Sequence, residues 1–351
     1  MISDFSLKNF KCFNKLELHN LKPITLISGK NNVGKTSLLD AVYFANRVNN
    51  PNTLLDLHIT RGVPLNKLTP ENLWGDLLFG RNISSVCEIK ENVNSKTIEI
   101  KSETKHVGNS SNVQIGAVAN NVSVSFPSFV SEISVAQSKE TVTTSIVGDN
   151  SINQNIHGNI KTLIYPNVIY LDTHRNHNED VIESFGKIDI AGNSTQVVDV
   201  LKLIEPPIKE LSVVVSGGTN QIFALAENSP RKVSLKSMGD GLNRLMEMVI
   251  TVIANPKSVI LIDEIENGFH YSLHKDLWKV LAKAAVLAES QLIATTHSYE
   301  CISAAGQAVR ETGLPDDFLY IRIDKEAEKF VPKYYGTDLL LSATNNAVEV
   351  R

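Results

Sequence analysis

The sequence predicts an α/β protein in which a mostly parallel, helix-covered sheet is interrupted by a β-rich lobe. Near the N-terminus, a strand over residues 24–28 leads through a glycine-bounded loop into an apolar-periodic helix over residues 37–48. Strands and helices alternate again from residue 233 to residue 295. Between these regions the composition shifts toward Val, Ser, Thr, Asn and Ile. We therefore divide the 351 residues into two halves of one α/β domain, 1–82 and 161–351, and an inserted lobe, 83–160.

Composition sets the broad class of the protein. Apolar residues make up 42% of the chain and charged residues 21%, as in ordinary globular proteins. The net charge of -4 gives no overall basic surface, so nucleic-acid binding would need a local basic patch. The cysteines have no C-x-x-C spacing, which favours a reducing, cytoplasmic location over disulfides or a zinc site. We expect neither a signal peptide nor a membrane-spanning segment.

The first half of the chain begins with alternating apolar and polar residues over 2–18, which predict a strand pair. Residues 49–82 are punctuated by prolines and give no functional interpretation. In the lobe, residues 107–121 are expected to be the most flexible part. The lobe shows no sustained heptad pattern, so we expect no long coiled coil.

The second half regains α/β character. It is expected to contain strands over 168–171, 211–215, 221–225, 258–262, 291–295, 318–324 and 330–335. Helices are expected over about 195–205, from 235 through 254, over 272–289 and at the C-terminus. Pro206 and Pro207 would end the first of these helices.

The strongest motif lies between the first predicted parallel strand and its helix, where residues 29–36 match G-x-x-x-x-G-K-[ST] in full. Glycines let backbone amides curl around phosphate oxygens, and the helix N-terminus adds partial positive charge. Lys35 would reach the β and γ phosphates, and Thr36 would bind magnesium. A glycine turn with an unrelated lysine is disfavoured by the flanking strand and helix. The predicted nucleotide-binding residues are Gly29, Asn31, Asn32, Val33, Gly34, Lys35, Thr36 and Ser37.

A second motif consists of four aliphatic residues, 259–262, followed by Asp263 and Glu264. A buried parallel strand would deliver these acids to the carboxyl edge of the sheet. Asp263 would hold the magnesium ion, and Glu264 would position and deprotonate the attacking water. Such a run alone could equally be a strand ending in a solvated acidic turn. The phosphate-binding motif upstream favours the catalytic interpretation.

A third motif, residues 237–241, reads Ser-Met-Gly-Asp-Gly and precedes a strongly periodic helix. Ser237 and Asp240 could form a capping box, which would be a purely structural role. Gly239 and Gly241 fit that role poorly, because two glycines in a first turn weaken a helix. They are better explained if backbone amides there approach a ligand closely.

Together with residues 295–298, Thr-Thr-His-Ser, these motifs resemble the Walker A, Walker B, signature and switch-histidine motifs of ABC-type ATPases. The resemblance implies an ABC-ATPase-like P-loop head that hydrolyses ATP with Mg²⁺. It assigns Ser237, Gly239 and Gly241 to the ATP held by a second copy, and His297 to the γ-phosphate of its own copy. A homodimer or higher oligomer with composite ATP sites follows. Taken alone, His297 would be an ordinary histidine.

Residues 7–13, 29–36 and 265–270 narrow the resemblance to the chromosome-organising (SMC), RecF-like and OLD-type branch. The compact ATPases of bacterial phage-defence operons look most similar. The resemblance covers about 1–50 and 160–351. It implies a switch that couples sensing to a separate effector protein, a nuclease or toxin, because the carboxylates of a Toprim nuclease are not found.

Two other functions have less support in the sequence. A RecF-like DNA clamp would need basic clustering, of which only Lys8 and Lys11 give a sign. A P-loop kinase would leave the third motif and His297 without a purpose.

Two assignments are weaker. The glutamine of the family's Q-loop has no clear counterpart, although residues 170–175 lie where a comparable loop could be, with Arg175 as a candidate ligand. His174 and His177, with Glu179 and Asp180, could suggest a metal site. Loop histidines at this spacing are more often solvated.

Overall fold

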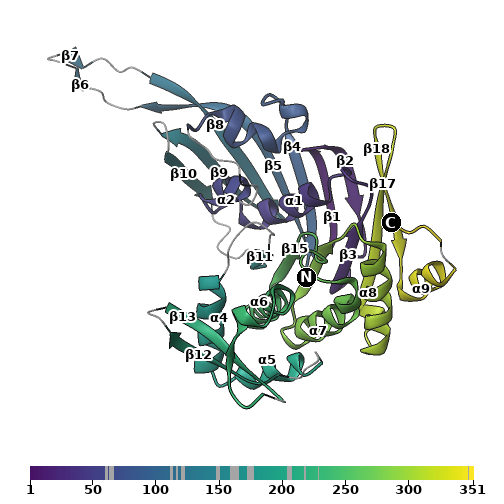
Figure 1. The fold of residues 1–351 in the computed structure, drawn as a ribbon. Coiled ribbons are helices and arrows are strands. Elements are labelled where there is room, and N and C mark those ends of the chain that lie inside the picture. Colours follow the sequence, from purple (N-terminus) through teal and green to yellow (C-terminus); the bar gives the residue numbers. More distant parts are fainter. Residues whose placement is uncertain are drawn as a thin grey trace.

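The protein is described by a computed structural model, which shows an antiparallel sheet packed beside a helix-covered parallel sheet (Figure 1). The structure describes residues 1–59, 62, 67–110, 114–115, 118–119, 123–147, 151–158, 166–171, 178–203, 208–216, 219–227, 229–346 and 348–351.

The helices are α1 (Lys35–Arg47), α2 (Thr53–Ile59), α3 (Pro70–Leu73), α4 (Asn178–Ile190), α5 (Ser194–Leu201), α6 (Asp240–Ala254), α7 (His274–Leu287), α8 (Tyr299–Glu311) and α9 (Thr337–Asn345). Short 3₁₀ turns occur at Gly75–Leu77, Phe79–Arg81, Leu235–Ser237, Tyr271–Leu273 and Pro315–Asp317. Within the described residues, none of the helices is long and apolar enough to cross a membrane.

A six-stranded sheet forms the centre of the α/β part. Its strand order is β11 (Val168–Leu171), β15 (Val259–Ile262), β16 (Gln291–Thr295), β3 (Ile24–Ser28), β17 (Phe318–Glu326) and β18 (Lys329–Tyr335). The first five strands run parallel, and β18 returns antiparallel to β17. This sheet agrees with the predicted α/β class, and β3, β11 and β16 have the predicted limits.

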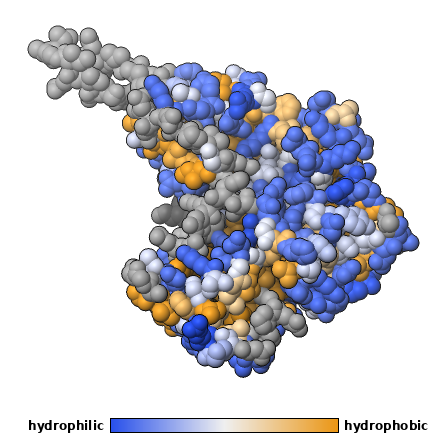
Figure 2. Space-filling model, in the orientation of Figure 1, coloured by the Kyte–Doolittle hydropathy of each residue, from blue (hydrophilic) through white to orange (hydrophobic). Residues whose placement is uncertain are grey.

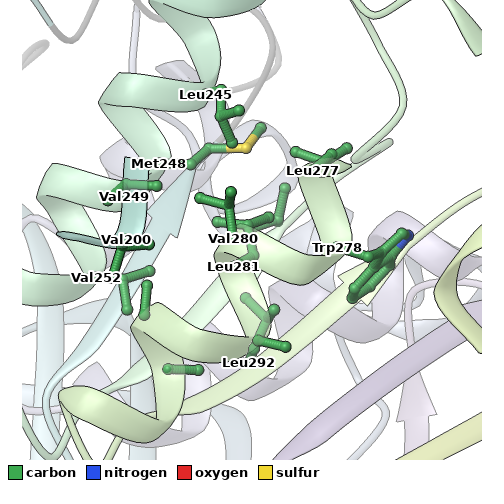
Figure 3. Packing of buried hydrophobic residues seen from close by; sticks show 14 of the residues in the cluster. Val200, Leu245, Met248, Val249, Val252, Leu277, Trp278, Val280, Leu281 and Leu292 are labelled. Atoms are coloured by element: carbon green, nitrogen blue, oxygen red, sulfur yellow. The ribbon is translucent and has the colours of Figure 1, made fainter. Parts of the chain in front are cut away.

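Continuous apolar runs form the central strands because both faces of this sheet are buried. In β15, Ile260 and Ile262 join one hydrophobic core, whereas Val259 and Leu261 join the other. Figure 3 shows part of the first core, where side chains from α5, α6 and α7 meet Leu292 of β16. The second core lies between the parallel sheet, α1 and the antiparallel sheet. The strand ends are therefore held rigidly by packing on both sides.

The antiparallel sheet has seven strands. Their order is β10 (Ser151–Gly158), β9 (Ser138–Val147), β8 (Ser123–Val135), β5 (Lys96–Ser110), β4 (Cys87–Val93), β1 (Ile2–Phe10) and β2 (Phe13–Leu18). The predicted strand pair over 2–18 thus pairs with β4, the first strand of the predicted lobe. The β-rich segment therefore extends a sheet that begins at the N-terminus. The limits proposed for it, residues 83 and 160, remain predictions.

Two smaller sheets complete the described fold. One contains β12 (Ile208–Ser216), β13 (Thr219–Ala226) and β14 (Val233–Ser234), and the other pairs β6 (Gln114–Ile115) with β7 (Val118–Ala119). In Figure 2 the visible face is largely hydrophilic, with hydrophobic residues gathered near α4, β12 and β13. Two hydrophobic side chains of these elements are strongly exposed: Ile190, the last residue of α4, is 91% exposed, and Val215 of β12 is 71% exposed.

Four helices were not predicted from the sequence: α2 and α3, in the proline-punctuated segment 49–82, and the longer helices α4 and α8. In α8, Ser298 accepts a hydrogen bond from the backbone N of Cys301 at 3.1 Å, so a serine cap starts this helix. In α4, the described side chains Val181, Phe185 and Ile188 pack into the first core. Most of the segment 107–121, and Pro206 and Pro207, lie outside the described residues or side chains.

Candidate nucleotide-binding site

Three adjacent strands bring the sequence motifs together at one edge of the parallel sheet. In the strand order, β16 lies between β15 and β3, so their carboxyl ends are neighbours. The loop of residues 29–34 follows β3, Asp263 and Glu264 follow β15, and His297 lies two residues beyond β16. Loops at this edge of a parallel sheet are the usual place for ligands in α/β proteins.

Residues 29–36, called the phosphate loop below, depend on left-handed backbone conformations. Gly29 has a φ of 154° and Gly34, directly before α1, has a φ of 95°. A Cβ on Gly34 would lie 2.4 Å from Sγ of Cys12 and 2.7 Å from Cζ of Phe13. Both the backbone angle and the close packing therefore require glycine at position 34.

The side chain of Lys35 folds back onto the first residues of the phosphate loop. Its Nζ donates hydrogen bonds to the carbonyl oxygens of Gly29 at 2.9 Å and Lys30 at 3.4 Å. Burial lowers the pKa of Lys35, while Asp263, Glu264 and Glu266 oppose that shift. The ammonium group is thus oriented by backbone and placed near acids, where a phosphate could take over its hydrogen bonds.

Thr36, in the first turn of α1, contacts Asp263, which directly follows β15. Thr36 Oγ1 lies 3.3 Å from Asp263 Oδ1, to which it donates a hydrogen bond. Thr295, the last residue of β16, donates to the same oxygen at 2.6 Å. The hydroxyl and carboxylate oxygens are therefore close together beside the phosphate loop. Such oxygens are the ligands that Mg²⁺ prefers in proteins.

Glu264 has an unusual backbone conformation, with a φ of 46°. Its backbone N donates to Thr295 Oγ1 at 2.9 Å, which fastens it to β16. Asn267 Nδ2 donates to Glu264 Oε2 at 2.8 Å. A strained backbone held by neighbouring groups is common at functional sites. These contacts direct the Glu264 side chain, which lines the pocket described next.

A pocket of about 560 Å³ lies over the phosphate loop and is called the phosphate pocket. Its lining residues are Cys12, Asn31, Asn32, Gly34, Lys35, Thr36, Ser37, Glu264 and His297. Of the other predicted residues, Gly29 borders a neighbouring pocket of about 420 Å³ with Lys30 and Arg322, and Val33 is buried. Most of the predicted set is therefore gathered around one cavity.

Two residues were missed that contact this site. Cys12 comes from the turn between β1 and β2 and reaches the pocket, a contact for which the sequence gives no local signal. Glu266 is 8% exposed, and its Oε1 accepts a hydrogen bond from the backbone N of His297 at 2.8 Å. Its position two residues after Glu264 could have marked it as a further acid of the same loop.

Residues 237–241, called the signature turn below, do not line the phosphate pocket of their own chain. The predicted alternative, a capping box, is wrong. Gly239 is the N-cap of α6, this cap has no side-chain hydrogen bond, and Ser237 Oγ donates to the carbonyl oxygen of Ser234 at 2.7 Å. Ser237 and Gly239 are exposed, and Gly241 packs against the loop at Gly268.

Other residues raised by the sequence analysis lie elsewhere. Lys8 is 3.8 Å from Glu88, and Lys11 pairs with buried Asp40, so neither lysine contributes an unpaired charge. His174, Arg175 and His177 lie outside the described residues, as do the side chains of Glu179 and Asp180. Among the residues that are described, no group of His, Cys, Asp and Glu is arranged to hold a metal ion by itself.

Comparisons with known proteins find a family, a relative and a solved structure to which this chain is similar. The model of the family described as "AAA domain, putative AbiEii toxin, Type IV TA system" matches residues 24–303. A protein named ATP/GTP phosphatase from Helicobacter pylori (strain ATCC 700392 / 26695) is 23% identical over 371 residues, with 97% of each chain covered. A crystal structure of the SmcHead bound to the C-winged helix domain of ScpA has a TM-score of 0.52 at 13% identity. It covers 96% of this chain and 98% of that chain.

The family match spans most of the chain, so the chain belongs to this AAA family. Membership confirms the prediction of an ATPase. The likeness to the SmcHead confirms the predicted ABC-ATPase-like fold.

Proposed function

We propose that this AAA-family ATPase is a molecular switch in which ATP joins two copies of the chain. The phosphate loop of one copy would hold the nucleotide, and the signature turn of the second would complete the site. One observation carries the proposal: the signature turn is exposed and stands outside the pocket that the other motifs share. A turn of this composition, starting a helix with unpaired amides, is suited to bind an anion supplied by another molecule.

Within each copy, the phosphate loop amides and Lys35 would bind the phosphates. The close approach of Thr36 Oγ1 and Asp263 Oδ1, 3.3 Å apart, fits a magnesium ion held directly by the hydroxyl and through water by the carboxylate. Magnesium, when bound, would neutralise charge that develops on the phosphates. Lys35 would exchange its hydrogen bonds with Gly29 and Lys30 for phosphate oxygens.

Hydrolysis would depend on Glu264 and His297, which line the phosphate pocket together. Glu264 would accept a proton from the attacking water, and Asn267 would hold its carboxylate in place through the 2.8 Å hydrogen bond. His297 would contact the γ-phosphate and so distinguish ATP from ADP. Loss of that contact after hydrolysis would release the second copy.

A subunit-mixing experiment tests the composite site. Lys35→Ala removes the phosphate lysine and Ser237→Arg blocks the signature turn, so each variant alone should be inactive. When the two variants are mixed in equal amounts and exchange subunits, half of the dimers should contain one copy of each variant. Each of these mixed dimers has one intact site. The expected ATPase activity is about a quarter of that of the unchanged protein, because only one site in two works in half of the dimers.

The control for this experiment mixes Lys35→Ala with a variant that carries both substitutions, which cannot form an intact site. Activity in this control should stay at background. If the mixture of single variants also stays at background although mixed dimers form, the signature turn does not serve a second copy. GTP should be assayed beside ATP, because the Helicobacter pylori relative is named for both nucleotides.

The switch is proposed to act on a separate effector protein in bacterial defence against phages, in the cytoplasm. The family description, which names a toxin of a type IV toxin–antitoxin system, supports an effector of that general kind. The test is affinity purification of the Glu264→Gln variant with ATP from cells that express the neighbouring genes. Recovery of a neighbouring nuclease or toxin with ATP, but not with ADP, is expected. Equal recovery with both nucleotides would contradict the coupling.

The alternative of a RecF-like DNA clamp draws less support. The outer face of the antiparallel sheet carries charges of both signs, including the pairs Lys90–Glu99 at 2.7 Å and Lys105–Glu132 at 3.1 Å. A face with alternating charges attracts phosphate backbones weakly. Salt-dependent binding of the purified protein to duplex DNA would favour the clamp instead.

A further inference from the structure

We propose that Glu266 is a positioning residue that fixes the ring of His297 for its contact with the γ-phosphate. The inference rests on the proposed function of His297. Glu266 follows Glu264 by two residues, and its carboxylate faces the loop after β16 rather than the phosphate pocket. It is therefore an acid at the site that takes no direct part in the chemistry proposed above.

The contact between Glu266 and His297 has two parts. Oε1 of Glu266 accepts a hydrogen bond from the backbone N of His297 at 2.8 Å. Ring atom Nδ1 of His297 lies 2.9 Å from the same oxygen. One carboxylate oxygen of Glu266 therefore holds both the backbone amide and the imidazole ring of His297.

Burial makes this arrangement costly unless it has a purpose. The Glu266 side chain is 8% exposed, and its Oε2 is buried without a hydrogen-bond partner among the described residues. A buried polar atom without a partner destabilises the folded state, because it has lost its hydrogen bonds to water. A methionine of similar length would avoid that cost. The acid is thus explained by what it does to His297.

His297 needs such a partner because its own side chain is 49% exposed and could otherwise rotate. With a proton on Nδ1 facing the carboxylate, the ring plane is fixed and Nε2 is left for the pocket that His297 lines. A carboxylate behind a histidine commonly sets its tautomer and orientation in other sites. Glu266 would do so here for a residue that reads phosphate.

The test compares two substitutions of Glu266. Glu266→Met removes the acceptor, and kcat for ATP should fall about 10- to 100-fold, as for other residues that orient a functional histidine. KM should change less than about twofold, because the phosphate loop is untouched. Glu266→Gln keeps a carbonyl oxygen at the same place and should retain most of the activity. Glu300→Met, a neighbouring exposed acid that contacts Ser298, should leave kcat unchanged.

A double-mutant cycle separates positioning from a general structural role. If Glu266 acts through His297, adding Glu266→Met to His297→Ala should lower kcat no further. Full additivity of the two effects would overturn the inference while leaving the role of His297 standing. If His297→Ala alone has no effect, both this inference and the proposed role of His297 fail. Thermal unfolding of each variant verifies that the comparison concerns folded protein.

Discussion

Two helices of this protein begin at a glycine with a positive φ, and the two starts differ in their surroundings. Gly34 precedes α1 with a φ of 95°, and Gly239 precedes α6 with a φ of 98°. Neither cap has a side-chain hydrogen bond. A Cβ on Gly34 would meet Cys12 at 2.4 Å, whereas a Cβ on Gly239 would meet nothing within 4 Å.

The difference separates a helix start that is packed within its own chain from one that its own chain leaves open. Around Gly34, the turn between β1 and β2 covers the phosphate loop and supplies Cys12 to the pocket. Around Gly239, by contrast, the start of α6 is open, since Gly239 and Asp240 are exposed in the single chain. The same feature, a glycine N-cap without a side-chain hydrogen bond, thus lies in a packed pocket at α1 and on an open surface at α6. The open surface is where we expect the second copy.

Glu264→Gln should have the largest effect, because it removes the base and leaves both glycine turns intact. The amide cannot accept the proton of the attacking water, so kcat should fall about 10²- to 10⁴-fold. ATP binding should persist, and the proteins should remain joined as dimers when ATP is present. Steady-state turnover and the mass distribution in light scattering with ATP and with ADP provide the measurements.

Glu289→Gln is the matched control for this change. Glu289 is a 72% exposed acid near Lys257, two residues before the start of β16 and thus at the opposite end of that strand from the site. Its substitution should change neither turnover nor assembly. If Glu264→Gln hydrolyses ATP at the normal rate, the proposed base is wrong.

Gly34→Ala should have the next largest effect and tests the packed turn. Alanine would strain the backbone, at a cost of order 1–3 kcal/mol. Its Cβ would also push the side chains of Cys12 and Phe13 away from residue 34. Both effects should lower the melting temperature and weaken nucleotide binding by tenfold or more. Calorimetric titration with ATP and thermal unfolding measure them. Unchanged affinity would show that the nucleotide does not use this loop.

Gly239→Ala tests the open turn and should be milder in stability. Only backbone strain opposes this alanine, because a Cβ there has open space. Each chain should still bind ATP, while ATP-dependent assembly and turnover should fall by roughly tenfold, as expected for a loss near 1.4 kcal/mol at the interface. Gly313 has a φ of 76° and equally open surroundings. Gly313→Ala therefore carries similar strain and should leave turnover unchanged.

The fold was predictable where the signal is local. Strands β3, β11 and β16 were placed to the residue because their apolar runs are short and bounded by turns. Pairing was less accessible, since nothing in residues 2–18 shows that β1 lies beside β4. Helix α8 had a usable signal in Ser298, followed by Cys301, Ile302 and Ala305 at helical spacing.

The candidate site shows the same limit. Motif spacing placed Lys35, Thr36, Asp263, Glu264 and His297 at one edge of the sheet, and the strand order brings them together. Cys12 could not be found this way, because its contact with the phosphate loop is made by tertiary packing of a distant turn. The exposure of the signature turn was likewise implied only by family resemblance.

The smallest effect concerns Cys12, which should report occupancy of the packed site without altering it. Cys87 and Cys301 are 2% and 0% exposed, so Cys12 is the accessible thiol among the three cysteines. Burial raises the pKa of the Cys12 thiol, so alkylation should be slow at pH 7. Below that pKa, the rate should increase up to about tenfold for each unit by which the pH is raised. ATP should slow the reaction several-fold at any fixed pH, as measured by mass spectrometry of the peptide that contains Cys12.

In Gly239→Ala this protection should persist, because the phosphate loop binds nucleotide without the second copy, whereas in Lys35→Ala it should disappear. Loss of protection in Gly239→Ala would mean that the two glycine turns bind ATP only together, and the contrast between them would not hold.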